Sequence, residues 1–176
     1  MIKVTAISDL HGKQSKIQHL LSGGDILFCT GDITPIINRT IFAVLSFLKW
    51  FDAQNYTYKI LIGGNNDSFL QRHEKYIRAL IAKKYSSVTY LNDEQIQLTI
   101  RNRPVSIFGT PHSINGTHRA FVLNSLQDQI QKLRQTRFHS FARPSSSYSR
   151  LQRRMPNSTG SNQHIEAEVS PVWSHS

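Results

Sequence analysis

The chain has 176 residues, enough for one ordinary domain, and carries a formal net charge of +10. A single cysteine, Cys29, excludes an internal disulfide framework, and no segment reaches the roughly 20 apolar residues that a membrane-spanning helix needs. The chain does not open on the pattern of a secretory signal peptide. We therefore expect a cytoplasmic protein with no membrane partner, and Cys29, which lies in an apolar run, to be a small buried hydrophobe. The sequence leaves the oligomeric state open.

Strand and helix patterns alternate along the first two-thirds of the chain. Strands are predicted over residues 2–7, 25–29 and 58–62, and apolar stripes at helical spacing cover residues 14–21, 41–51 and 69–81. Three further short strand patterns follow at residues 87–91, 96–100 and 105–108. This alternation predicts an α/β fold whose parallel strands are joined by crossover helices.

The last third of the chain has a different composition. Leu123, Leu126, Ile130 and Leu133 indicate a last helix within residues 120–137, and the pattern after Phe138 is polar and of low complexity. After residue 118, eight Lys and Arg stand against three Asp and Glu. We therefore divide the chain into a folded domain, residues 1–121, and residues 122–176, a helix followed by a basic, Ser-rich, disordered tail. A tail of this kind can bind nucleic acid through the release of counterions.

Polar side chains follow each of the first three predicted strands. Asp9 and His11 follow the first, Asp32 the second and Asn65 the third. Because the carboxyl ends of parallel strands meet at one edge of a sheet, these four side chains are expected to converge there. Carboxylate, imidazole and amide ligands suit divalent ions such as Mn, Fe or Zn, and an Asp shared between two cations is the usual basis of a two-metal site.

The same residues resemble a known family. Asp9-x-His11, Gly31-Asp32 and Gly64-Asn65-Asn66-Asp67 are similar to the first three motifs of the calcineurin-like metallophosphoesterases, whose usual forms are D-x-H, G-D and G-N-H-[DE]. The flanking sequence looks closest to the small metallophosphoesterase-domain subfamily. Its matching segments are Gly24–Leu27, Lys59–Asn65, Tyr90–Leu91, Phe108–Pro111 and Ala120–Phe121. The resemblance covers residues 1–121.

This resemblance implies a fold and an activity. The fold would be a metallophosphoesterase-like β-sandwich flanked by helices, here incomplete and limited to its N-terminal half. Asp9 and His11 would bind a first divalent ion (Mn, Fe, Zn or Mg), Asp32 would bridge two ions and Asn65 would bind the second. A metal-activated water would attack the phosphorus of a phosphodiester, and the substrate would be a small phosphoester or nucleotide.

Two departures from the family pattern bear on catalysis. Asn66 stands where the family has a histidine that contacts phosphate and can protonate the leaving group, and an amide cannot act as a general acid near neutral pH. Asp67 normally orients that histidine and is here expected to cap the next helix; Asn66 and Asp67 are the candidate catalytic positions. The histidine motifs of the family's second half are also missing. Five histidines come after the three matched motifs, but none stands in the family's pattern: His112, His118, His139, His164 and His175.

Three functions follow from these observations. The favoured function is a metal-dependent phosphoesterase. The first alternative is a truncated, catalytically weak or inactive relative that retains metal or phosphate binding, as Asn66 and the missing histidines indicate. The second alternative is a basic protein that binds nucleic acid through its Arg-rich tail. Because the second ion keeps only Asp32 and Asn65 as ligands, we expect an incomplete metal site with one ion in place of two.

Overall fold

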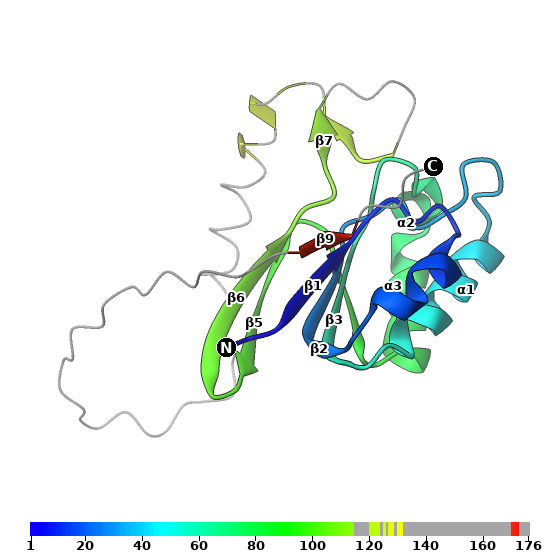
Figure 1. Cartoon of the computed structure of the whole chain (residues 1–176). Helices are drawn as coiled ribbons and strands as arrows, with labels where there is room; N and C mark the ends of the chain where they lie inside the picture. Colours follow the sequence, from blue (N-terminus) through cyan, green and yellow to red (C-terminus); the bar gives the residue numbers. More distant parts are fainter. Residues whose placement is uncertain (115–119, 124, 126, 129, 132–169, 173–176) are drawn as a thin grey trace.

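The computed structural model describes residues 1–114, 120–123, 125, 127–128, 130–131 and 170–172. Its centre is a five-stranded, entirely parallel sheet in the order β4-β3-β2-β1-β9. The strands are β1 (Val4–Ile7), β2 (Gly24–Cys29), β3 (Tyr56–Ile62), β4 (Val88–Leu91) and β9 (Ser170–Val172). The α-helices α1 (Ile41–Asp52), α2 (Ser68–Arg72) and α3 (Glu74–Lys84) cover one face of the sheet (Figure 1).

A β-hairpin forms a layer on the other face of the sheet. β5 (Glu94–Ile100) and β6 (Arg103–Gly109) pair antiparallel through a two-residue turn at Arg101 and Asn102. Both turn residues have positive φ, 50° and 64°, the conformation that matches the twist of a tight hairpin. The hairpin packs over a buried apolar cluster that includes Ile26, Ile60 and Ile100. The predicted α/β class, with a parallel sheet flanked by helices, is confirmed.

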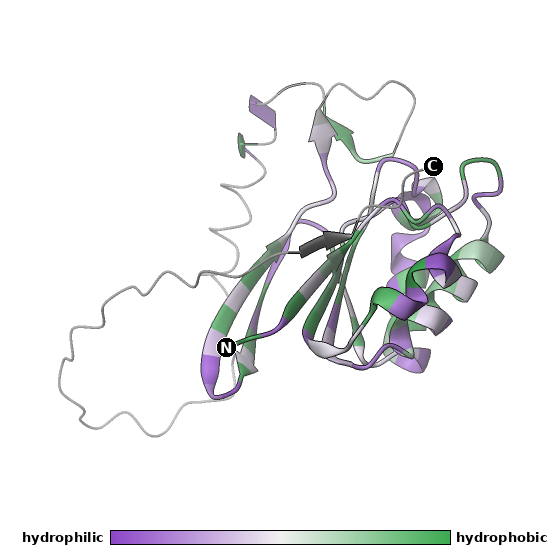
Figure 2. Cartoon of the chain, in the orientation of Figure 1, coloured by the Kyte–Doolittle hydropathy of each residue, from purple (hydrophilic) through white to green (hydrophobic). Residues whose placement is uncertain are grey.

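The main hydrophobic core lies between the helices and the sheet. Apolar positions of α1 recur at helical spacing, so that Val44, Phe47, Leu48 and Phe51 are all fully buried on one side of the helix. The sheet strands that they cover are largely apolar, while polar residues gather at the outer surfaces (Figure 2). Cys29 is buried in this core, where burial raises the pKa of its thiol, which confirms that it is a small buried hydrophobe.

Several elements differ from the sequence prediction. Residues 14–20 form a 3₁₀ helix, η1 (Gln14–Leu20), and the predicted helix over 69–81 is divided into α2 and α3 at His73. Two short strands, β7 (Ser113–Ile114) and β8 (Val122–Leu123), pair in parallel where a helix was expected to begin. Residues 127, 128, 130 and 131 are helical. The helix predicted from Ala120 is therefore wrong over its first turn.

Three residues of the predicted tail belong to the sheet. Strand β9 pairs with the outer edge of β1, with Pro171 opposite Ala6. Proline is tolerated in such an edge strand because one side of it needs no donor to the ladder. Residues 132–169 and 173–176, to which the prediction of a disordered, nucleic-acid-binding tail applies, lie outside the described residues. Among the helices described, none is long and apolar enough to span a bilayer.

Candidate metal centre

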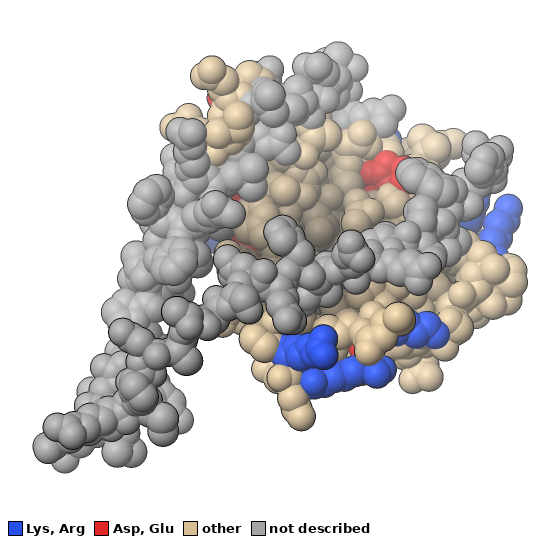
Figure 3. All heavy atoms as spheres, turned by 60° about the vertical axis from the view of Figure 1, so that its left-hand side comes forward, with Lys and Arg blue, Asp and Glu red and all other residues tan. Residues whose placement is uncertain are grey.

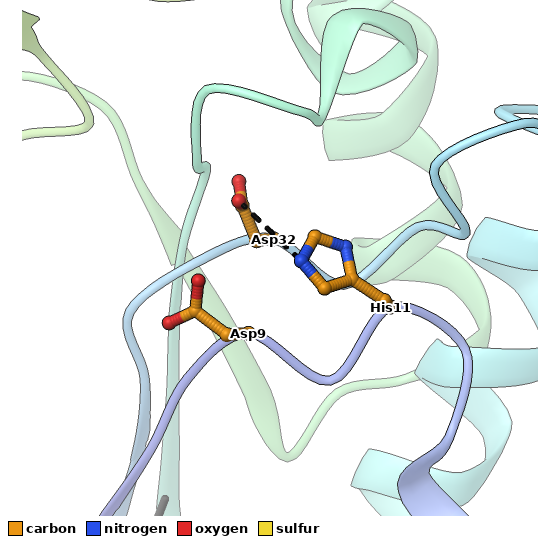
Figure 4. Close-up of side chains that lie close together, drawn as sticks. All are labelled: Asp9, His11 and Asp32. Carbon is orange, nitrogen blue, oxygen red and sulfur yellow. Dashed lines mark ion pairs between the residues drawn. The ribbon is translucent and has the colours of Figure 1, made fainter. Parts of the chain in front are cut away.

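Three of the predicted ligands meet at the carboxyl edge of the sheet. Asp9 and His11 lie on the loop after β1, and Asp32 lies on the loop after β2. One ligand atom from each side chain lies within 4.8 Å of the others (Figure 4). The predicted convergence of these three residues is confirmed, and they fit one divalent cation by number and chemical type, since two carboxylates and an imidazole are ligands that Mn, Fe and Zn accept.

All three candidate ligands have a left-handed backbone, which is uncommon outside glycine. The φ angles are 57° at Asp9, 45° at His11 and 55° at Asp32. Such a conformation costs on the order of 1–2 kcal/mol per residue relative to ordinary backbone. Two hydrogen bonds hold the loops in it, from the Asp9 amide to Gly31 O (3.2 Å) and from the His11 amide to Asp32 O (2.9 Å). Strain concentrated at three converging polar residues is typical of a functional site.

Two glycines allow the loops after β2 and β3 to touch. A Cβ on Gly31 would lie 2.5 Å from the Cα of Gly64, and a Cβ on Gly64 would lie 2.3 Å from the backbone nitrogen of Asp32. Gly31 also has a φ of 108°, which side chains rarely adopt. The glycines that flank the polar residues are therefore needed for the close backbone approach that brings the third loop to Asp32.

The tautomer of His11 follows from its contact with Thr34. His11 Nδ1 lies 3.2 Å from the Thr34 carbonyl oxygen, which can only accept a hydrogen bond. Nδ1 therefore carries a proton, which leaves Nε2 as the ring nitrogen that can offer a lone pair to a cation. Nε2 faces Asp32, 3.9 Å from its Oδ2 (Figure 4). An imidazole fixed by a backbone carbonyl is the usual arrangement of a histidine that ligates a metal.

The loop after β3 places Asn66 against Asp32. The Asn66 amide N–H donates to Asp32 Oδ1 (2.8 Å), and its side-chain Nδ2 donates to Asp32 Oδ2 (2.5 Å) and to Asn65 Oδ1 (3.1 Å). Asn66 Oδ1 accepts a hydrogen bond from Arg39 Nη2 (3.1 Å). Asn65 is thus connected to the three-residue cluster through Asn66. Sequence reasoning missed Arg39, whose only signal was its place as the first cation after the Gly31-Asp32 motif.

The Asp67 side chain connects the loop after β2 with the loop after β3. Its carboxylate is completely buried and accepts hydrogen bonds from the backbone amides of Gly64 (2.9 Å), Ile33 (3.3 Å) and Thr34 (3.1 Å), and from the Thr34 hydroxyl (3.0 Å). Burial raises the pKa of this carboxyl, and the amide donors oppose the rise. Asp67 stands at the N-terminal position of α2 but makes no side-chain cap there, so the prediction that it caps this helix is wrong.

A histidine–aspartate pair, His112 and Asp93, connects the two ends of the β5–β6 hairpin. His112 Nε2 is 2.8 Å from Asp93 Oδ2, the Thr110 hydroxyl donates to Asp93 Oδ1 (2.9 Å), and His112 packs edge-on against Phe121. This pair was not predicted, because the two residues are far apart in the sequence and belong to no recognised spacing. The other candidate histidines, His118, His139, His164 and His175, lie outside the described residues.

The surface charge is uneven on one face of the molecule. Figure 3 shows acidic side chains in a hollowed part of that face, while Lys and Arg side chains lie apart from them. Within the described residues, Asp9, His11 and Asp32 are the group of His, Cys, Asp or Glu that could hold a metal. The chemical types of these three residues fit a divalent cation.

Comparisons with known proteins agree with this chemistry. The profile of the family described as "Calcineurin-like phosphoesterase" matches residues 2–173, beyond the limit of residue 121 that the motifs set. The chain is also 28% identical over 124 residues to "Probable rhamnogalacturonate lyase C" of Emericella nidulans. That match covers 69% of this chain and 11% of the fungal protein, so the chain spans about a tenth of that relative's length.

Proposed function

The chain belongs to the calcineurin-like phosphoesterase family, and on this premise we propose that it hydrolyses phosphodiesters with the help of a bound divalent cation. The observation that carries the proposal is the convergence of Asp9, His11 and Asp32 on left-handed backbone at one edge of the sheet. These three residues would hold the cation. When bound, such an ion lowers the pKa of coordinated water and stabilises negative charge on phosphoryl oxygens.

The side chains around the cation would have separate tasks. His11 is held with Nε2 as its free lone pair by Thr34, and Asp32 keeps lone pairs for a cation because each carboxylate oxygen offers two. The Arg39 guanidinium donates a hydrogen bond to Asn66 Oδ1, and planar guanidinium groups suit phosphoryl oxygens. Arg39 would therefore orient a phosphoryl group whose ester oxygen leaves as an alcohol.

The charge of the site favours a diester. The Asp9 and Asp32 carboxylates would bring two negative charges to the site, and one divalent cation together with Arg39 would leave a net charge of +1 there. A phosphodiester brings one negative charge to this site, whereas a monoester brings between 1.5 and 2 at pH 7, roughly. With no general acid at Asn66, substrates with acidic leaving groups, such as aryl alcohols, would react fastest.

A catalytically weak relative is the second candidate. Asn66 supports it, because an amide in place of a general acid typically forfeits about 10²–10⁴-fold in rate. Binding of nucleic acid by the basic tail remains a proposal that rests on composition alone. A cytoplasmic location is likewise a proposal.

The test is turnover of bis(4-nitrophenyl) phosphate and of 4-nitrophenyl phosphate by purified protein, with and without added Mn²⁺. We expect Mn-dependent hydrolysis with a preference for the diester, and its loss in Asp32→Asn. Asp52→Asn is the matched control, because Asp52 ends α1 at the far edge of the molecule and bonds to Ser87. Metal binding without turnover would support the weak relative, and a chain that binds no divalent cation would refute the proposal.

A further inference from the structure

We propose that the Asn66 side-chain amide occupies the position of a second cation, so that this chain holds one metal ion where the family holds two. The inference rests on the proposed metal-dependent function and concerns the same site. It starts from one side-chain oxygen of each residue that the resemblance assigns to the second ion, Asp32 Oδ2 and Asn65 Oδ1. Asn66 Nδ2 lies 2.5 Å from the first and 3.1 Å from the second.

The orientation of this amide is fixed by its partners. Nδ2 faces a carboxylate and a carbonyl oxygen, both acceptors, and Oδ1 faces the Arg39 guanidinium, which can only donate. The reversed amide would set oxygen against oxygen and nitrogen against the guanidinium. Asn66 therefore presents N–H groups, not a ligand oxygen, toward Asp32 and Asn65.

The amide and a second cation compete for the same electron pairs. Both Nδ2 hydrogens are used, one on each oxygen, and Asn66 is almost completely buried. A cation that entered would have to displace both hydrogen bonds and leave two buried donors unsatisfied, which is unfavourable. The backbone N–H of Asn66 also donates to Asp32 Oδ1, so the loop itself has to move before the side chain can leave.

Arg39 makes the amide a partial substitute for the cation. Its Nη2 donates to Asn66 Oδ1, and its Nε donates to the Ile36 carbonyl, which fixes the guanidinium beside the loop. Hydrogen bonds in such a chain polarise one another, so a positive charge behind Oδ1 strengthens the Nδ2 donors toward Asp32. Asp32 Oδ2 also faces His11 Nε2 at 3.9 Å, and the first cation would lie between these two atoms and Asp9.

The experiment counts metal ions directly. The full chain, freed of metal with a chelator, is titrated with Mn²⁺ alone, and stoichiometry is measured by calorimetry, with electron paramagnetic resonance to detect pairs of adjacent ions. The variants are Asn66→Asp, which replaces the two donors with ligand oxygens, and Asn55→Asp, which adds the same charge to an exposed site at the opposite edge of the sheet. Asn66→Ala, which removes both side-chain donors, is used as well in case the Asn66→Asp protein does not fold.

We expect one Mn²⁺ per chain in the wild type and in Asn55→Asp. We expect two ions with an exchange-coupled spectrum in Asn66→Asp, and a weaker second ion in Asn66→Ala. Two coupled ions in the wild type would overturn the inference and leave the proposed function standing, as would a single ion in both folded Asn66 variants. A wild-type chain that binds no Mn²⁺ would instead refute the proposed function.

Discussion

Replacing Gly64 with alanine should damage the site through a single added carbon. The new Cβ would lie 2.3 Å from both the backbone nitrogen and the Oδ1 of Asp32. Ordinary contact begins near 3.4 Å, so the loops after β2 and β3 must separate by about 1 Å. No rotamer change relieves this contact, because backbone is involved. Overpacking of this kind costs typically about 1–3 kcal/mol of stability, and a misplacement of about 1 Å in an active site can cost about 100-fold in rate.

The assay compares Gly64→Ala with Gly24→Ala. A Cβ on Gly24, at the start of β2 and away from the candidate ligands, would meet the flexible side chain of Lys3 at 3.1 Å and the Lys3 backbone oxygen at 3.2 Å, contacts that a shift of a few tenths of an ångström relieves. We expect Gly64→Ala to lower Mn²⁺ affinity and to cut diester turnover by about two orders of magnitude, with urea unfolding at a lower midpoint. Gly24→Ala should change none of these by more than a small factor. Wild-type metal affinity in a folded Gly64→Ala protein would refute the reasoning from loop contact.

Three further predictions concern the same chain. Mn²⁺ at about 100 times its dissociation constant should stabilise the fold by about 2.7 kcal/mol, which corresponds to a rise of about 5–10 °C in melting temperature. Asp9→Asn should abolish this rise. An equal rise in that variant would place the ion elsewhere. Asn66→His should leave kcat for an aryl diester below about 1 s⁻¹, the low end for enzymes, because a new acid does not replace a missing cation; faster turnover would contradict this. Asp25 accepts hydrogen bonds from the Lys3 amide and from Arg101, which lower the pKa of its carboxyl group. The ionised carboxylate therefore stabilises the folded protein above the ordinary pKa of 3.8, and this stabilisation is lost as the pH falls below that value. Asp25→Asn should therefore lower the urea midpoint at pH 7 and approach the wild type below pH 4, and a gap that widens in acid would show the sign to be wrong.

The sheet could be predicted from sequence because it depends on local patterns. Buried parallel strands appear as short apolar runs, and each was followed by a polar residue that the topology then carried to one edge. This explains why Asp9, His11 and Asp32 were found together as predicted.

What the sequence did not reveal depends on contacts between distant segments. Arg39 reaches Asn66 across 27 positions, and His112 meets Asp93 across 19. The role of Asp67 was mistaken for the same reason: its position suits a helix cap, but its carboxylate is drawn into bonds with residues 33 and 34. Strand β9 is supplied by a segment whose composition indicates no strand at all.

The strained backbone of the ligands has to be offset by bonds that do not involve the cation. Left-handed conformations at Asp9, His11 and Asp32 together cost on the order of 3–6 kcal/mol. Asp67 accepts four hydrogen bonds from the two loops beneath the site, and bonds to a charged acceptor contribute about 1.5–3 kcal/mol each. One such bond is comparable in size with the strain at one of the three residues, so these bonds can help to hold the loops in place before any ion arrives. Asp67 thereby supports the proposed metal site without belonging to it, because its carboxylate is bonded to the backbone of the two loops.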